Sequence, residues 1–200
     1  MTSVVARITN RLRRLLARAL RANDFFPVHP FGRSPWGSEA EYLALFEDAR
    51  SRESEGVSDF ERTSGFAVDR EWLNRLALET QVVVKPSPLS FEHGRLLWSA
   101  LRSFLATNIP AGQPITVFET GTGRGFSSIV MANAIRSAGV DGRVISLDLL
   151  PHGEEMIWNS ISDVRRGPIS RSSLLESWPE ELERIIFLQC WTSRQLGRIG

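Results

Sequence analysis

The stretch from Ile115 to Gly125 reads ITVFETGTGRG and decides the fold class. Its first half is apolar and β-branched, as in a buried strand. Its second half has glycines at 121, 123 and 125, which allow positive φ and let main-chain amides approach a ligand. An apolar-periodic helix follows from Ile129 to Ile135, and the free amides and positive dipole end at its start face the same turn. We therefore expect a strand, an anion-attracting turn and a helix; the alternative is a turn without a ligand.

Two further strands are expected downstream. Residues 143–148, RVISLD, end in Asp148, and residues 184–189, RIIFLQ, form a third buried strand. Helical patterns around residues 156–164 and 172–183 lie between them. The alternation of strand and helix predicts an α/β, Rossmann-like parallel sheet with flanking helices. In such a sheet the carboxyl ends of the strands line the ligand crevice, where Asp148 could accept both hydroxyls of a ribose.

The chain before the first strand is predicted to be an α-helical extension. Ser38 and Glu41 have the spacing of a capping box, and Asp69 precedes a second apolar-faced helix. A third helix is expected from Ser90 onward. The charge-rich residues 47–62 are expected to be solvated.

Residues 3–21 have the pattern of a basic amphipathic helix. Three interpretations stay open: a helix packed on the domain or a partner, a membrane-surface anchor, and a cleaved targeting peptide. The expected organisation is this helix in residues 1–24, a helical extension in residues 25–88, and the sheet domain in residues 89–200.

The composition is that of a globular protein without a membrane span. Of 200 residues, 42% are hydrophobic and the formal net charge is +1, which argues against a dedicated nucleic-acid surface. No run approaches the roughly 18 apolar residues of a transmembrane helix. The single cysteine, Cys190, excludes an internal disulfide and a cysteine-based zinc cluster, and it fits a reducing compartment. We expect a cytoplasmic protein, peripheral to a membrane if the basic helix is an anchor.

These residues resemble the class I S-adenosylmethionine-dependent methyltransferases. The run from Glu119 to Gly125 matches their acidic-x-Gly-x-Gly-x-Gly signature, and Asp148 matches the acidic residue that ends their second strand. A nicotinamide-binding fingerprint would need a glycine at position 126, where this chain has Phe126. Ser127 and the run EHGRLLW at residues 92–98 are similar to the bacterial small-molecule O-methyltransferases of the catechol and caffeoyl-CoA type.

The resemblance implies a role for each position of the turn. Glu119 would lie near the amino group of the cofactor's methionine moiety, Ser127 would bind its carboxylate, and Asp148 would accept the ribose hydroxyls. Trp191 could stack on the adenine, although a tryptophan after a buried strand is more often part of the core. The implied cofactor-binding set is Glu119, Gly121, Thr122, Gly123, Gly125, Phe126, Ser127, Asp148 and Trp191.

Catalytic residues are less defined than the cofactor site. His93 and His152 are weak candidates for the base, and Lys85 could reach a carboxylate. No metal ligands are assigned, and a divalent metal is neither expected nor denied. Since a complete class I domain has seven strands, the chain resembles its N-terminal half and is expected to be truncated after the third strand, or completed by another chain. The strand at Ile115 would then be an unprotected edge.

Three functions are therefore considered. The first is S-adenosylmethionine-dependent methyl transfer to a small-molecule acceptor, at oxygen by analogy with the similar enzymes. The second is a noncatalytic fragment or scaffold with an incomplete cofactor pocket. The third is a nicotinamide-dependent oxidoreductase. The oligomeric state is not predicted.

Overall fold

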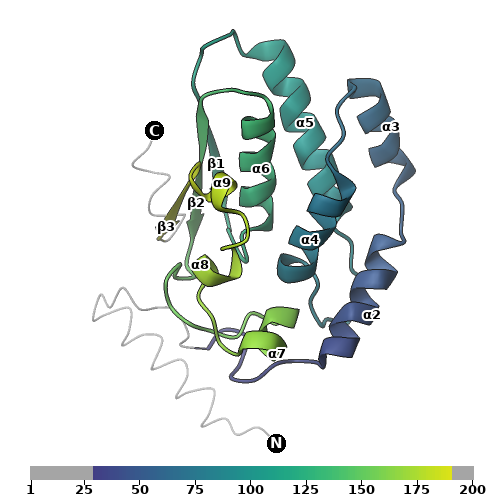
Figure 1. Cartoon of the computed structure of the whole chain (residues 1–200), viewed down its shortest axis with the longest axis vertical. Coiled ribbons are helices and arrows are strands. Elements are labelled where there is room, and N and C mark those ends of the chain that lie inside the picture. Colours follow the sequence, from purple (N-terminus) through teal and green to yellow (C-terminus); the bar gives the residue numbers. More distant parts are fainter. Residues whose placement is uncertain (1–28, 191–200) are drawn as a thin grey trace, which may run out of the picture. The chain divides into compact units, whose positions relative to one another are not determined.

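A computed structural model of the chain describes residues 29–190 (Figure 1). The chain divides into two compact units, Met1–Pro30 and Phe31–Gly200, and every helix and strand described belongs to the second. The basic helix predicted in residues 1–24 lies outside the described residues, as does Trp191. Between residues 29 and 190, no helix has both the length and the apolar character needed to cross a membrane.

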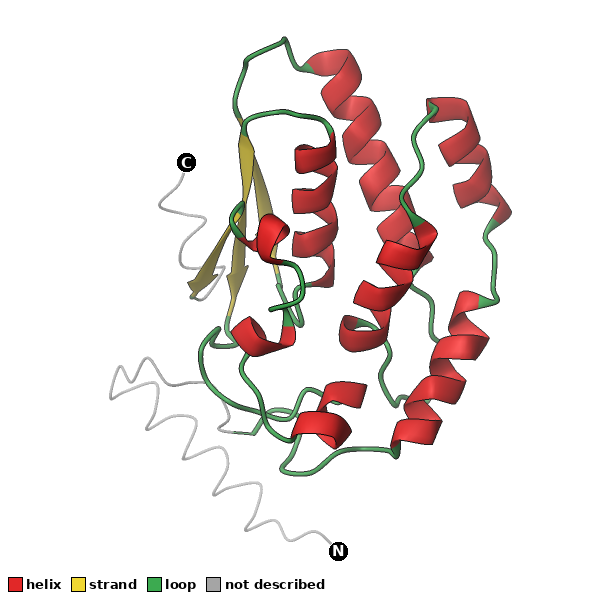
Figure 2. Cartoon of the chain, in the orientation of Figure 1, coloured by secondary structure: helices red, strands yellow, loops and turns green. Residues whose placement is uncertain are grey.

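Three parallel strands form the sheet: β1 (Ile115–Thr120), β2 (Gly142–Asp148) and β3 (Ile185–Gln189), in the order β1-β2-β3 (Figure 2). The three predicted strands are confirmed to within one residue, and the Rossmann-like α/β class with them. The register pairs Glu119 with Ser146, and Ser146 with Phe187. Because paired residues of parallel strands point to the same face, these side chains share one side of the sheet.

Helices cover that side of the sheet. Helix α6 (Phe126–Ser137) packs on β2 and β3, and α5 (Glu92–Asn108) packs on α6 (Figure 1). Leu105, Met131, Ile135 and Val144 form the buried core between these layers. Since α6 follows β1 directly, its N-terminus lies at the carboxyl edge of the sheet, where the glycine turn is.

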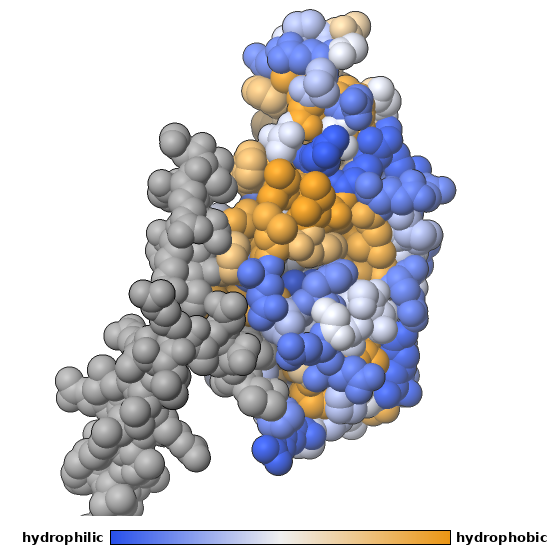
Figure 3. All heavy atoms as spheres, turned by 90° about the vertical axis from the view of Figure 1, so that its left-hand side faces the viewer, coloured by the Kyte–Doolittle hydropathy of each residue, from blue (hydrophilic) through white to orange (hydrophobic). Residues whose placement is uncertain are grey.

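The opposite side of the sheet is apolar, and no helix among residues 29–190 packs on it. Phe118, Ile186 and Leu188 are 52%, 40% and 44% exposed, and Figure 3 shows hydrophobic residues gathered on this side of the molecule. Parallel sheets normally have both sides covered. Within residues 29–190, β1 pairs only with β2, so its outer edge is unpaired there, as the sequence led us to expect.

Two of the predicted N-terminal helices have the expected caps. Helix α2 (Glu39–Arg50) begins with the Ser38–Glu41 capping box, and α4 (Arg70–Thr80) begins at Asp69, whose side chain accepts a 2.9 Å hydrogen bond from the Trp72 amide. Their buried side chains join the same core as α6; this core includes Tyr42, Phe46, Leu73, Leu76, Phe126 and Ile129.

Helix α3 (Glu55–Ser64) was missed by the sequence analysis, which expected only a solvated segment over residues 47–62. Its surface is mostly exposed and charged and it contains few apolar residues, with Val57 as its buried residue. A buried ion pair attaches it to α5: Arg95, 2% exposed, binds Glu61 of α3 and Glu92 of its own helix. Helix α5 begins at Glu92, two residues later than the predicted Ser90.

The segment between β2 and β3 differs most from expectation. It contains three short helices, α7 (Ile161–Arg166), α8 (Arg171–Leu174) and α9 (Pro179–Leu182), and not helices over residues 156–164 and 172–183. Met156 forms an antiparallel bridge with Ile169. Pro179, the first residue of α9, interrupts the pattern predicted over residues 172–183, since proline lacks an amide hydrogen and clashes with the preceding turn.

Candidate functional site

The glycine turn joins β1 to α6 at the carboxyl edge of the sheet. Gly121, Gly123 and Gly125 have φ values of 83°, 55° and 91°, in the left-handed region that other residues rarely adopt. The Gly121 amide donates to the Leu147 carbonyl of β2 at 2.7 Å. The turn is therefore fixed to the neighbouring strand at the point where β1 ends.

Gly125 is required for a second reason. A Cβ atom at this position would lie 2.6 Å from Cδ1 of Leu175, a fully buried residue that follows α8. No atom within 4 Å would meet a Cβ atom at Gly121 or Gly123. The glycine at 125 thus serves close packing as well as backbone conformation, whereas the other two leave open space beside the main chain.

Glu119, at the end of β1, is surrounded by serine hydroxyls. Ser127 donates to its Oε1 atom, Ser128 donates to its Oε2 atom, and Ser146 of β2 donates to Oε2 at 2.6 Å. Ser146 and Thr122 also share a 2.6 Å hydrogen bond between their hydroxyls. These contacts orient the carboxylate at the start of α6, where the helix dipole favours negative charge.

Ser127 was expected to bind a carboxylate of the cofactor, and in this structure its hydroxyl contacts Glu119. Gly125 is the N-cap of α6 and has no side chain with which to cap the helix. Within the described residues, the amides of Phe126, Ser127 and Ser128 have no acceptor. These amides are the groups at this helix start that could bind an anion.

Asp148, at the end of β2, is bound to the glycine turn. Its Oδ2 atom accepts a 2.6 Å hydrogen bond from the Gly123 amide, and its Oδ1 atom accepts one of 3.0 Å from the Leu150 amide. Arg171 of α8 approaches Oδ2 at 3.3 Å and donates from Nε to the Gly123 carbonyl at 2.9 Å. The second carboxylate is thereby placed beside the turn.

Arg171 is a site residue that the sequence analysis missed. It is 2% exposed and its guanidinium lies 5.6 Å from the ring of Trp158 and 5.8 Å from that of Phe187. Burial lowers its pKa, while Asp148 and Glu119 act in the opposite direction. No local motif marks this arginine, because only the fold of residues 149–184 brings it to the turn.

Arg124, within the turn, anchors the long segment that follows β2. Its Nε atom donates to the Trp158 carbonyl at 2.5 Å, and its guanidinium lies 5.2 Å from the ring of Phe31. Burial lowers the pKa of Arg124 to about 10. The charges of Asp163 and Tyr42 act in the opposite direction and partly offset the effect of burial. The side chain points into the protein, so this position of the motif is structural.

Phe126 also has a structural side chain. It is 2% exposed, and a Cβ atom at Gly94 would lie 2.5 Å from its Cζ atom. His93 packs edge-on against it, with ring centroids 5.0 Å apart. Only the main-chain amide of Phe126 remains available to a ligand, and the glycine of the His93-Gly94-Arg95 run is explained by this close contact.

The two candidate bases lie in different places. His93 is at the start of α5; burial and the charge of Lys85 lower its pKa. His152 stacks on Phe187 at 4.3 Å; burial and the charge of Arg171 lower its pKa. Both imidazoles are therefore neutral at pH 7 and able to accept a proton. Among residues 29–190, no three His, Cys, Asp or Glu side chains form a cluster that could bind a metal ion.

No protein-family model and no curated protein matches the chain. Among solved structures, it is similar to a cyclopropane-fatty-acyl-phospholipid synthase-like protein from Lactobacillus casei ATCC 334, with 17% identity, a TM-score of 0.33, and coverage of 66% of this chain and 43% of that one. It is also similar to the O-methyltransferase NovP, with 15% identity, a TM-score of 0.35, and coverage of 78% and 65%.

A third similar structure is an uncharacterized protein from Burkholderia thailandensis, with 17% identity, a TM-score of 0.33, and coverage of 79% of this chain and 39% of that one. The chain therefore spans less than two thirds of the length of each of these three proteins.

Proposed function

We propose that the protein binds S-adenosylmethionine at the glycine turn and belongs to an enzyme that transfers its methyl group to a small molecule, at an oxygen atom. The observation that supports this most directly is the pair of carboxylates beside the turn, at the carboxyl ends of β1 and β2. Glu119 is oriented by three serine hydroxyls, and Asp148 is bound to the Gly123 amide. The cofactor has an amino group on its methionine moiety and a ribose between the sulfur and the adenine, and two separate carboxylates could bind these two parts.

The residues present fit such a ligand in charge and in shape. Glu119 would accept hydrogen bonds from the ammonium group, and the amides at the start of α6 would receive the cofactor's carboxylate. Asp148 would accept the ribose hydroxyls. The open space beside Gly121 and Gly123 would let the ligand approach the main chain.

When bound, S-adenosylmethionine supplies a methyl group attached to a positively charged sulfur, and this sulfur is a good leaving group when an acceptor oxygen displaces it directly. The protein's part is to align the acceptor with that methyl group and to remove the acceptor's proton where needed. His93 and His152 are neutral at pH 7 and are the candidates for proton removal. A reducing compartment such as the cytoplasm fits the free Cys190.

The test is calorimetric titration with S-adenosylhomocysteine. Glu119→Gln and Asp148→Asn should each weaken binding by about ten- to a hundredfold, the value of a hydrogen bond to a charged group. Asp141→Asn, which replaces an exposed carboxylate directly before β2, is the matched control and should leave the affinity unchanged. Binding that is equal in all four proteins would refute the assignment of the two carboxylates.

A noncatalytic scaffold is the second candidate, because Asp148 already has partners within the protein. Its two oxygens accept hydrogen bonds from Gly123, Leu150 and Arg171. A purely structural role for Asp148 predicts that Asp148→Asn destabilises the fold while the wild type gives no heat with S-adenosylhomocysteine.

A fluorescence titration with NADH distinguishes the third function, a nicotinamide-dependent oxidoreductase, which predicts saturable binding.

A further inference from the structure

Gly123, Asp148 and Arg171 form a closed ring of three hydrogen bonds at the carboxyl edge of the sheet. The Gly123 amide donates to Oδ2 of Asp148 at 2.6 Å, and Nε of Arg171 donates to the Gly123 carbonyl at 2.9 Å. Nη2 of the same guanidinium donates to Oδ2 of Asp148 at 3.3 Å. Both main-chain polar groups of Gly123 are therefore held by one acidic and one basic side chain.

Arg171 is buried beneath this ring and does not face solvent. It is the first residue of α8, which lies beside the carboxyl ends of the strands (Figure 1), and it is 2% exposed. Its guanidinium carbon lies 5.6 Å from the ring of Trp158 and 5.8 Å from that of Phe187. Because so little of Arg171 is accessible, its effect on a ligand at the turn must pass through Asp148 or Gly123.

The hydrogen bonds within the protein leave one acceptor position on the Asp148 carboxylate. An ionised carboxylate has about four such positions, two on each oxygen. Those of Oδ2 are taken by the Gly123 amide and by Arg171, whereas Oδ1 accepts only from the Leu150 amide, at 3.0 Å. The Asp148 side chain is 12% exposed, so part of it is accessible to a ligand.

We propose that Arg171 is a positioning residue that limits Asp148 to a single ribose hydroxyl, accepted by Oδ1. Without Arg171, a carboxylate at the end of the second strand has room for both hydroxyls of a ribose, one on each oxygen. This inference rests on the proposed function, because it concerns the ribose of the ligand at the glycine turn. It narrows the contacts of Asp148 with that ribose from two to one.

The first test is calorimetric titration of the full wild-type chain with adenosine, 2′-deoxyadenosine and 3′-deoxyadenosine. One of the two deoxynucleosides should bind about ten- to a hundredfold more weakly than adenosine, the value of a hydrogen bond to a charged group. The other should bind within about twofold of adenosine, because its missing hydroxyl has no acceptor on Asp148. Asp148→Ala removes the acceptor and should bring all three nucleosides within about twofold of one another.

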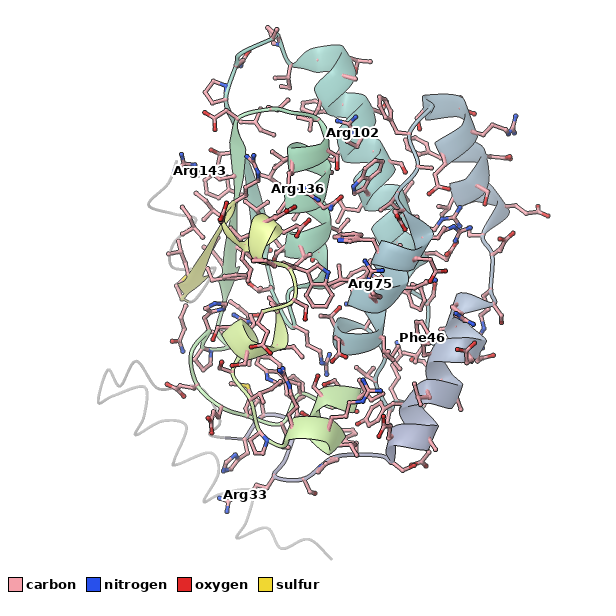
Figure 4. All side chains as sticks on the ribbon, in the orientation of Figure 1. Arg33, Phe46, Arg75, Arg102, Arg136 and Arg143 are labelled. Carbon is pink, nitrogen blue, oxygen red and sulfur yellow. The ribbon has the colours of Figure 1, made fainter. Side chains whose placement is uncertain are left out.

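The second test removes Arg171. In Arg171→Met, Oδ2 is open to the second hydroxyl, so the two deoxynucleosides should bind within about threefold of each other. Arg171→Lys keeps the charge and a donor and should restore part of the discrimination. Arg143→Met is the matched control: it replaces an exposed arginine at the amino end of β2, the opposite end from Asp148 (Figure 4), and should retain the full discrimination.

The outcomes separate this inference from the proposed function. If the wild type binds adenosine and both deoxynucleosides are at least about tenfold weaker, Asp148 accepts both hydroxyls; the inference is then overturned while the proposed function stands. It is also overturned if Arg171→Met weakens all three nucleosides equally and retains the discrimination, since Arg171 would then serve the fold alone. No heat with adenosine, or equal affinities for all three nucleosides in the wild type, would contradict the ribose site itself and this inference with it.

Discussion

Replacing Gly125 by alanine tests the structural basis of the glycine turn. At a φ of 91°, a non-glycine residue costs about 1–2 kcal/mol, and the added Cβ atom would lie 2.6 Å from Cδ1 of Leu175. Leu175 is fully buried, so its side chain cannot move aside into solvent. Overpacking of this kind costs about 1–3 kcal/mol, and alanine recovers about 0.5 kcal/mol by restricting the unfolded chain. We expect Gly125→Ala to lower the free energy of unfolding by about 2–4 kcal/mol.

The comparison is with Gly121→Ala, measured by urea denaturation followed by circular dichroism. Gly121 has a similar φ of 83°, but its Cβ atom would meet nothing within 4 Å. Its substitution should therefore cost about 1 kcal/mol, the backbone strain alone. The double variant Gly125→Ala/Leu175→Ala should lose less free energy of unfolding than the sum of the losses of the two single variants, because the smaller side chain removes the clash. Equal losses for Gly121→Ala and Gly125→Ala would refute the packing argument.

Three further predictions concern the ion pair, the histidine and the open sheet. Arg95→Met should lower the free energy of unfolding in urea by about 3–5 kcal/mol, since it leaves the buried carboxylate of Glu61 without its ion-pair partner. The control Arg62→Met removes an exposed pair and should change it by less than about 1 kcal/mol; similar losses would contradict the argument. Burial and Arg171 lower the pKa of His152 from 6.5, so the folded state binds fewer protons than the unfolded state. Stability should then fall as the pH decreases through 6.5, more steeply in the wild type than in His152→Gln, and equal slopes in thermal melts would contradict this. Phe118→Thr should change the free energy of unfolding by less than about 0.5 kcal/mol and reduce light scattering, because the side chain is 52% exposed; a large destabilisation would show that it is buried.

The strands and the turn could be predicted because local sequence determines them. A β-branched run followed by alternating glycines specifies a strand and a left-handed turn without help from distant residues. The caps at Ser38 and Asp69 are local in the same sense, since each acts on amides within its own first turn. The predicted strands agree with the observed strands to within one residue, and both caps lie at the predicted residues.

The missed features depend on tertiary contacts. Helix α3 has few apolar residues, and its attachment through Glu61 and Arg95 joins positions far apart in the chain. In the segment between β2 and β3, Asn159 adopts a left-handed φ of 53° and binds both Tyr42 and Val84, which no helical pattern could indicate.

In the candidate site, too, the residues determined by local sequence could be predicted, and those that depend on tertiary contacts could not. Glu119 and Asp148 were identified from the ends of their strands, and the parallel register explains why Ser146 lies beside Glu119. Arg171 could not be identified, because it reaches Asp148 only through the fold of the preceding loop and short helix. The hydrogen bond from Ser127 to Glu119 likewise depends on the fold of the turn, which brings the start of α6 beside the end of β1.

The most direct test of the central claim compares S-adenosylhomocysteine with adenosine by calorimetry on the wild-type chain. If Glu119 binds the amino group and Asp148 the ribose, both ligands should bind, with S-adenosylhomocysteine at least about tenfold tighter, since adenosine lacks the group that contacts Glu119. Equal affinities, or no heat with either ligand, would contradict the assignment of the glycine turn and its two carboxylates to this cofactor.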